Sequence, residues 1–187
     1  MRIISGSFKG KKILQPKDIK TRPLKDLTKE SIFNVLSHSN KFQSKISGST
    51  ILDLFSGVGS FGLECLSRGA KHVTFIENYK GVLPILKKNL LSLKLDKNYH
   101  ISEQDILKEI NLNNNRNKFD IIFIDPPYKY KNFEKIIDNI YEKKLLKNNG
   151  IMIIHRYRKE KEDFSKKIKI LDEKKYGISK ILFASSA

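Results

Sequence analysis

The sequence predicts an α/β fold: a Rossmann-like sheet of about seven mostly parallel strands with helices on both faces, and a short N-terminal extension (hairpin and helix) before it. Two observations predict it. Beyond residue 49, buried apolar runs alternate with segments whose apolar residues recur at helical spacing, which is typical of βαβ units. The first 49 residues lack this alternation and are more basic. We therefore divide the chain into a basic extension, residues 1–49, and an α/β domain, residues 50–187.

The elements of the α/β domain follow from apolar runs, helical periodicity and turn residues. The predicted strands cover residues 50–55, 72–77, 99–102, 119–125 and 151–155, followed by 168–171 and 178–184. The predicted helices cover residues 61–68, 82–95 and 133–146. A turn at Tyr176 and Gly177 makes the last two strands an antiparallel pair at the end of the sheet.

The extension is expected to form a hairpin and one helix. Residues 2–5 and 11–14 flank a turn that contains Gly6 and Gly10, which predicts two short paired strands. Residues 26–36 have the spacing of an amphipathic helix. The side chains expected to face inward are those of Leu27, Ile32, Phe33, Val35 and Leu36.

The charge of the chain points to a polyanionic partner. It has 37 Lys and Arg against 20 Asp and Glu, a formal charge of +17. Lys outnumbers Arg 31 to 6, as in proteins of AT-rich genomes, and this bias explains part of the excess. However, the extension carries 11 basic and 3 acidic residues, against 26 and 17 in the other 138 residues. This concentration favours a nucleic-acid contact, although an extension that merely covers the sheet is the alternative.

Several classes of protein are disfavoured. Cys65 is the single cysteine, so no internal disulfide can form, and a reducing cytoplasm is the expected location. No apolar run reaches the ~18 residues of a membrane span, and the start lacks the apolar region of a signal peptide. One cysteine and four scattered histidines do not make a metal site. We expect a cytoplasmic monomer without membrane contact, metal or obligate protein partner.

A glycine-rich loop between the first strand and the first helix of the domain is the most informative motif. Gly57 and Gly59 lack a Cβ atom, so the backbone can turn tightly and approach a ligand. With Gly62, and with Glu77 twenty residues after Gly57, the spacing also fits dinucleotide binding, which makes NAD an alternative ligand. The carboxylate of Asp53 would face a pyrophosphate unfavourably, but it suits the cationic methionine end of S-adenosylmethionine. We therefore predict S-adenosylmethionine as the cofactor and S-adenosylhomocysteine as its product.

The carboxyl ends of the next strands supply further candidates for this site. Glu77 can accept hydrogen bonds from ribose hydroxyls, and Asp105 can accept one from the adenine amino group. Solvated strand-end acids are the alternative for both. The full set of predicted cofactor-binding residues is Asp53, Phe55, Ser56, Gly57, Gly59, Glu77, Asn78, Asp105 and Ile106.

Asp125-Pro126-Pro127-Tyr128 follows the strand at 119–125 and is the predicted catalytic motif. Two consecutive prolines fix φ and remove two N–H donors, so the turn presents acceptors without competing donors. Asp125 and the Pro126 carbonyl can together hold both hydrogens of an exocyclic amine and aim its lone pair at a methyl group. Tyr128 offers a face on which a base stacks. The methyl acceptor is therefore expected to be the amine of a flipped or unpaired base.

These motifs together resemble the class I methyltransferases that modify amino nitrogens, and the N-terminal segments narrow the resemblance to the bacterial RsmD family. The segments that carry it are residues 1–6, 8–10, 21–23, 29–36, 53–57 and 63–70. The resemblance covers nearly the whole chain, more loosely after about residue 150. The sequence departs mildly from the family pattern at two places. The family's basic position before the helix motif is Lys29 here, and small residues of the glycine loop vary.

The resemblance implies methylation of N2 of one guanine in small-subunit ribosomal RNA, on the assembled or assembling 30S particle. It also implies an RNA-facing role for basic residues of the extension, namely Arg2, Lys9, Lys11 and Arg22. His155 and Arg156, at the end of the strand at 151–155, have no clear counterpart in the family. They border the site or are structural, and the sequence leaves both possibilities open.

Three other functions were weighed. A DNA adenine-N6 methyltransferase uses the same four residues, but 187 residues leave little room for its target-recognition region. A protein-glutamine methyltransferase resembles the pattern with Asn in place of Asp125. From a different class, a catalytically silent RNA-binding assembly factor would not need both the glycine loop and Asp125–Tyr128.

Overall fold

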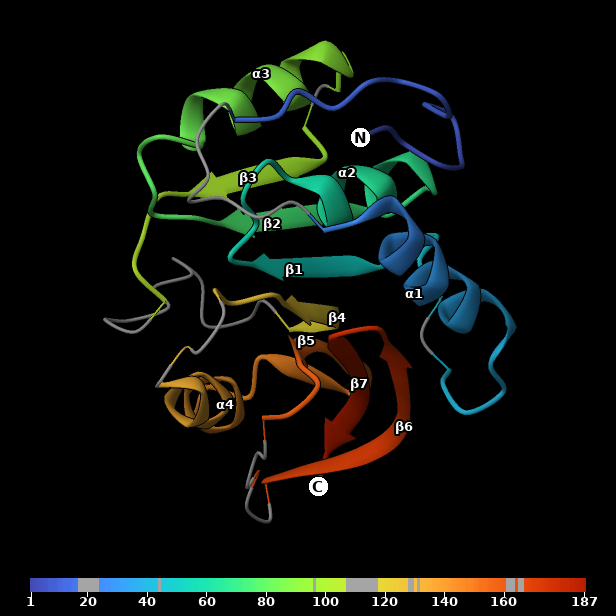
Figure 1. Cartoon of the computed structure of the whole chain (residues 1–187), viewed down its shortest axis with the longest axis vertical. Helices are drawn as coiled ribbons and strands as arrows, with labels where there is room; N and C mark the ends of the chain where they lie inside the picture. Colours follow the sequence, from blue (N-terminus) through green and yellow to red (C-terminus); the bar gives the residue numbers. More distant parts are fainter. Residues whose placement is uncertain are drawn as a thin grey trace.

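A computed structural model describes residues 1–16, 24–43, 45–95, 97–106, 118–127, 130, 132–160, 164 and 167–187. Seven strands form one sheet in the order β3-β2-β1-β4-β5-β7-β6 (Figure 1). The strands are β1 Thr50–Leu54, β2 His72–Ile76, β3 Tyr99–Ser102, β4 Phe119–Ile124, β5 Leu146–Tyr157, β6 Ile168–Tyr176 and β7 Ser179–Ser186. The helices are α1 Asp26–His38, α2 Ser60–Ser67, α3 Leu83–Ser92 and α4 Phe133–Glu142.

The sheet is parallel from β3 to β5 and antiparallel at β7 and β6, which confirms the predicted mixed sheet. The chain starts at β1, moves outward to β2 and β3, and then returns to the other side of β1 with β4. This reversal of direction opens a crevice at the carboxyl ends of β1 and β4, the usual ligand site in such sheets.

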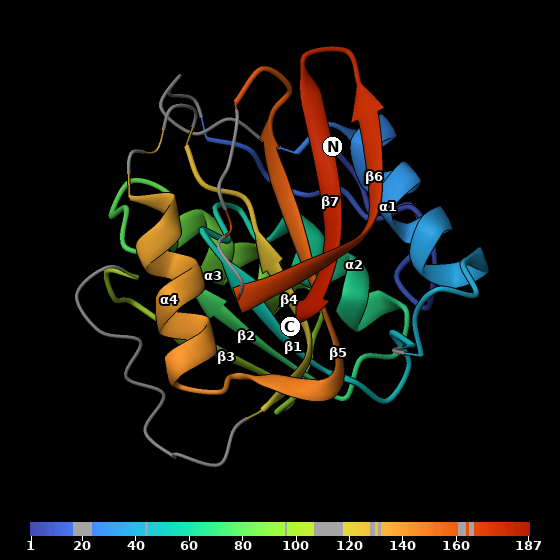
Figure 2. The ribbon, with the colours of Figure 1, turned by 90° about the horizontal axis from the view of Figure 1, so that it is seen from below.

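Each face of the sheet carries its own apolar core, because successive strand residues point to opposite faces. Ile51 of β1 packs with α1, α2 and α3 in one cluster, whereas Leu52 and Leu54 pack with α4 in the other. Figure 2 shows α4 on the opposite side of the sheet from α1 and α2. The prediction of helices on both faces is thus confirmed.

The extension packs onto the face that α2 and α3 cover. Ile3, Ile13, Ile32 and Phe33 are buried in the same cluster as these helices. Instead of the predicted paired strands, residues 2–5 and 11–14 form a single antiparallel bridge between Arg2 and Lys12. A boundary between residues 49 and 50 stays a prediction, since both parts share one core.

The predicted inward position of Leu27 is wrong. The Leu27 side chain is 74% exposed, whereas Lys29 of the same helix is 0% exposed. The Lys29 ammonium donates a hydrogen bond to the Arg2 carbonyl oxygen at 2.7 Å and lies 3.8 Å from the Glu64 carboxylate of α2. A polar network on α2 therefore decides which face of α1 is buried.

Element ends differ most around α4, β5 and β6; β6 extends to Tyr176 instead of ending at residue 171. The helix predicted to reach residue 146 ends at Glu142, because Lys144 adopts a positive φ of 49° and turns the chain toward β5. β5 then begins at Leu146 rather than at residue 151. Among the described residues, no helix is long and apolar enough to cross a membrane.

Candidate active site

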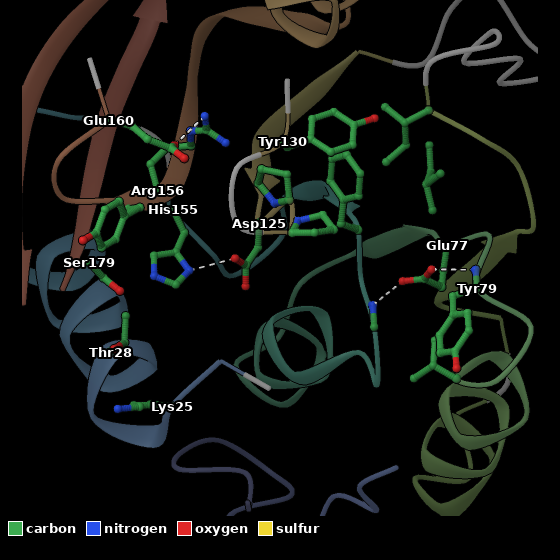
Figure 3. Close-up of a pocket in the computed structure, with 18 of the residues that line it drawn as sticks. Lys25, Thr28, Glu77, Tyr79, Asp125, Tyr130, His155, Arg156, Glu160 and Ser179 are labelled. Carbon is green, nitrogen blue, oxygen red and sulfur yellow. Dashed lines mark hydrogen bonds and ion pairs between the residues drawn. The ribbon is translucent and has the colours of Figure 1, made fainter. Parts of the chain in front are cut away.

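A large cavity of about 1300 Å³ lies at the carboxyl edge of the sheet. Residues at or near the carboxyl ends of the parallel strands line one side of it: Phe55, Gly57, Ile76, Glu77, Gln104, Asp105, Ile106, Asp125, Pro126 and His155. The other side is formed by the start of α1 and by the turn between β6 and β7 (Figure 3). A cavity larger than the usual ~300–1,000 Å³ of a small-molecule site has room for two ligands side by side.

The glycine loop borders the cavity through Gly57. Gly57 and Gly59 have positive φ values of 55° and 83°, and Gly59 precedes the first turn of α2. A Cβ atom on Gly59 would lie 2.6 Å from Cδ1 of Leu86, so a larger residue would have to displace this side chain as well as adopt a strained positive φ. Gly57 lines the cavity, whereas Gly59 and the buried Ser56 do not.

Glu77 holds the glycine loop and also lines the cavity. Its Oε2 accepts a hydrogen bond from the Gly57 N–H at 2.8 Å. Its Oε1 accepts from the N–H groups of Asn78 at 2.9 Å and Tyr79 at 2.8 Å. A carboxylate offers about four lone-pair sites, so one is left for a ribose hydroxyl. The side chain can therefore shape the loop and bind a sugar at the same time.

Asp53 lies beneath the cavity rather than in its wall. It is 1% exposed, and its Oδ2 accepts a hydrogen bond from the Gly62 N–H in the first turn of α2 at 3.0 Å. The predicted contact with the methionine end of the cofactor is therefore not supported by this position, and it stays a prediction. Burial raises the pKa of the Asp53 carboxyl well above its usual range. The hydrogen bond from Gly62 lowers this pKa, and the negative charges of Asp125 and Glu77 raise it further.

Replacing Asp53 with Asn is expected to stabilise the protein more at about pH 7 than at about pH 4. Because the pKa of Asp53 is raised in the folded state, its carboxyl does not lower the free energy of unfolding at a pH where it is protonated in both states. The free energy of unfolding falls as the pH rises above the pKa of the unfolded state, and the fall is complete above the pKa of the folded state. Urea unfolding at both pH values measures the difference. A stability change that is equal at the two values would contradict the assignment.

Asp105 and Ile106 also line the cavity, as does an aromatic pair. The Tyr130 ring packs edge-on against the Phe55 ring, with centroids 5.2 Å apart and planes at 74°. Burial raises the pKa of the Tyr130 hydroxyl, and the charge of Asp105 adds to this effect. Tyr128, predicted as the stacking residue, lies outside the described residues, so Tyr130 is an aromatic residue that the sequence reasoning missed.

Asp125 and His155 form a pair in the middle of the cavity wall (Figure 3). The register pairs Ile124 of β4 with Ile154 of β5, which brings the next residue of each strand together. His155 Nδ1 lies 2.7 Å from Asp125 Oδ1, and the two side chains are 14% and 21% exposed. If Asp125 is ionised, Nδ1 is the donor, and the imidazole fixes the orientation of the carboxylate.

His155 thus borders the site, which the sequence had left open. Its Nε2 is buried and has no hydrogen-bond partner among the described residues. Arg156 has a different environment, because it lies over the Phe133 ring at 4.4 Å and pairs with Glu160 at 2.5 Å. Alignment of the two strand ends was the signal that could have found the Asp125–His155 pair.

Three of the predicted RNA-binding residues of the extension, Arg2, Lys9 and Lys11, lie away from the cavity. Ser7 and Phe8 bond to Ser67 at the end of α2, and Lys11 bonds to the Ser92 carbonyl at the end of α3. Both helices run antiparallel to the strands, so these ends lie at the amino edge of the sheet. Arg2 and Lys9 are exposed in the same segment, and Arg22 lies outside the described residues. No group of side chains suited to a metal occurs in the described part of the chain.

The reversed strand order, the glycine loop and the acidic strand ends at one cavity define the class I methyltransferases, which use S-adenosylmethionine. The family described as "Conserved hypothetical protein 95" matches residues 1–185, and the chain belongs to this family. The RsmD resemblance is confirmed as well. Ribosomal RNA small subunit methyltransferase D of Haemophilus influenzae is 35% identical over 95% of this chain and 90% of its own length. The protein of the same name from Buchnera aphidicola of Acyrthosiphon pisum is 36% identical over 84% and 78%.

A solved structure agrees with this family assignment. "Putative methyltransferase yhhF from Escherichia coli" is 26% identical and superposes with a TM-score of 0.81. The match covers 100% of this chain and 97% of the other chain. The N-terminal extension is therefore included in the matched region.

Proposed function

We propose that the protein transfers a methyl group from S-adenosylmethionine to the exocyclic N2 amine of a guanine in small-subunit ribosomal RNA. The single observation that carries the proposal is the position of Asp125. Its carboxylate lies in the wall of one cavity, between the Glu77–glycine loop side and a second side with room for a base. The relatives named ribosomal RNA small subunit methyltransferase D support the choice of guanine and of ribosomal RNA.

The residues on the loop side fit the cofactor. Glu77 has lone-pair capacity left for the ribose hydroxyls, and the backbone at Gly57 allows close approach. Ile76, Val82 and Ile106 are buried apolar side chains that line the same side and suit the adenine ring. Asp105 would accept from the adenine amine, and Asn78 lies beside Glu77 at the cavity wall. When bound, the cofactor supplies an electrophilic methyl group on a sulfonium.

Asp125 and Pro126 would bind the two hydrogens of the acceptor amine. This arrangement turns the nitrogen lone pair toward the methyl carbon, and the carboxylate stabilises the positive charge that develops on nitrogen. The new N–C bond forms as the C–S bond breaks, and the nitrogen then loses one proton toward the Asp125 carboxylate. His155 acts through Asp125 as a positioning residue, since its Nδ1 holds the carboxylate in place.

We further propose that the natural substrate is the 30S particle and that the protein acts as a monomer. The basic extension would bind ribosomal RNA through Arg2, Lys9, Lys11 and Arg22. Because Arg2, Lys9 and Lys11 lie at the amino edge of the sheet, opposite the cavity, these three would contact RNA distant from the target base. They would add affinity rather than choose the nucleotide.

Transfer of labelled methyl to 30S particles, naked ribosomal RNA and DNA, followed by nucleoside analysis, tests the proposal. We expect label in N2-methylguanine, with 30S particles as the best substrate. Label in N6-methyladenine would show a DNA-type adenine methyltransferase instead. Tight RNA binding without any transfer would favour the assembly-factor alternative.

A further inference from the structure

Two unusually exposed apolar side chains lie beside the cavity. Six large apolar side chains of the described residues are exposed: Leu14, Leu27, Leu91, Tyr141, Ile170 and Ile178. Of these, only Leu27 and Ile178 line the cavity, at 74% and 51% exposure. Leu27 is in the first turn of α1, and Ile178 is in the turn between β6 and β7. Leu27 and Ile178 therefore add exposed apolar area beside the cavity.

Two lysines accompany these side chains. Lys25 immediately precedes α1, and Lys175 lies near the end of β6; both are exposed and both line the cavity. The Lys175 ammonium pairs with Glu173 at 2.9 Å, on the surface where such pairs exchange readily. We call Lys25, Leu27, Lys175 and Ile178 the cavity rim. It combines apolar contact area with positive charge.

The rim lies on the acceptor side of the cavity. In Figure 3, Lys25, Thr28 and Ser179 lie on one side of the Asp125–His155 pair, and Glu77 and Tyr79 lie on the other. If the cofactor is bound at Glu77, the methyl acceptor must come from the rim side. Its amine must then reach Asp125 inside the cavity, which a base stacked within a helix cannot do.

We propose that the cavity rim binds the RNA nucleotides that flank the target base and holds them apart once that base enters the cavity. Leu27 and Ile178 would pack against the faces of the neighbouring bases, which lose their stacking partner when the target turns out. Lys25 and Lys175 would contact the adjoining phosphates. The inference rests on the proposed function in one respect: the acceptor must be a base in RNA.

RNA is favoured over a protein as the occupant because of charge. The chain carries +17, and two of the four rim residues are lysines. Isolated apolar side chains next to phosphate-binding cations are typical of proteins that open a base stack. The predicted RNA-binding residues Arg2, Lys9 and Lys11 lie at the opposite edge of the sheet, so they leave the flanking nucleotides without a partner.

The double variant Leu27→Ala and Ile178→Ala tests the apolar part of the rim. We expect kcat/KM for 30S particles to fall roughly tenfold to hundredfold, as for two partly buried aliphatic contacts. Cofactor affinity, measured by calorimetry, should stay unchanged. The matched control is Leu91→Ala and Ile170→Ala, which removes the same side chains at exposed positions outside the cavity. Equal losses in both double variants would overturn the proposal.

The double variant Lys25→Glu and Lys175→Glu tests the charged part. Its binding to a ribosomal RNA fragment around the methylated guanine should show a salt slope that is shallower by about one for each lost phosphate contact. Lys88→Glu and Lys144→Glu make the same change in net charge at exposed positions outside the cavity. A slope that changes equally in both double variants would contradict a phosphate contact at the rim.

Two further outcomes separate this inference from the proposed function. If the wild-type protein methylates no guanine, the proposed function fails. If it methylates guanine but the rim variants match their controls, only the rim proposal fails. A fall in kcat/KM on 30S particles without any loss of RNA-fragment binding would indicate that the rim contacts a ribosomal protein, and it would overturn the proposal.

Discussion

Asp125→Ala is expected to lower the rate of methyl transfer roughly 10²- to 10⁴-fold, while cofactor binding stays within about twofold. Asp125 lies on the wall between the two sides of the cavity, where it would hold the acceptor amine. It bonds to His155, whereas the glycine loop is held by Glu77 through the Gly57 N–H and α2 by Asp53 through the Gly62 N–H. Single-turnover transfer and calorimetric titration with the cofactor measure the two effects separately.

His155→Leu supplies an internal check on this prediction. If His155 acts only by orienting Asp125, the leucine variant should lower transfer in the wild-type background and change nothing in the Asp125→Ala background. His155→Asn, which keeps a donor at the position of Nδ1, should restore part of the rate. Parallel loss of cofactor binding and transfer in Asp125→Ala would show that the assigned role is wrong.

Glu64→Ala is expected to lower the free energy of unfolding by about 3–5 kcal/mol, a large loss for a single substitution. The Glu64 carboxylate is fully buried and accepts hydrogen bonds from the N–H groups of Ile4 at 2.7 Å and Ser5 at 2.9 Å. It also pairs with Arg68 at 2.9 Å and lies 3.8 Å from the Lys29 ammonium. Among the described residues, its removal leaves the 0% exposed Lys29 with Asp26 and the Arg2 carbonyl as its remaining partners.

Urea unfolding measures this loss, and two variants sharpen the interpretation. Glu134→Ala removes an exposed glutamate from the first turn of α4 and should change stability by less than about 1 kcal/mol. Adding Lys29→Met to Glu64→Ala should recover part of the lost free energy of unfolding, because it removes a buried positive charge that has lost one of its acidic neighbours. A loss below about 1 kcal/mol for Glu64→Ala would mean that the pair behaves like one on the surface.

The sequence predicted the fold because the parallel strands are continuous apolar runs with loops at regular spacing. In the extension it predicted the burial of Ile32, Phe33 and Leu36, but not that of Lys29, which depends on partners distant in the chain. The spacing at residues 27–36 assigned Leu27 to the core, but the Glu64 carboxylate on α2 selects the face that carries Lys29 instead. Likewise, Lys144 adopts a left-handed backbone conformation although it is not a glycine, so the sequence did not predict where α4 ends.

For the candidate site, the sequence identified the strand-end acids but not their environments. Strand order brings Glu77, Asp105 and Asp125 to one cavity, as expected for acids that follow parallel strands. The burial of Asp53 under Gly62 depends on how α2 starts, and the pairing of Asp125 with His155 depends on the register of β4 and β5. Both contacts depend on tertiary packing, which local sequence patterns do not show.

Glu77 has a consequence for engineering. The same carboxylate that would recognise the sugar hydroxyls also fixes the Gly57 N–H and the start of the next loop. A variant designed to accept cofactor analogues with bulky ribose substituents cannot simply shorten this side chain. The design would have to supply a new acceptor for the Gly57 N–H, or the glycine loop would lose its shape along with its selectivity.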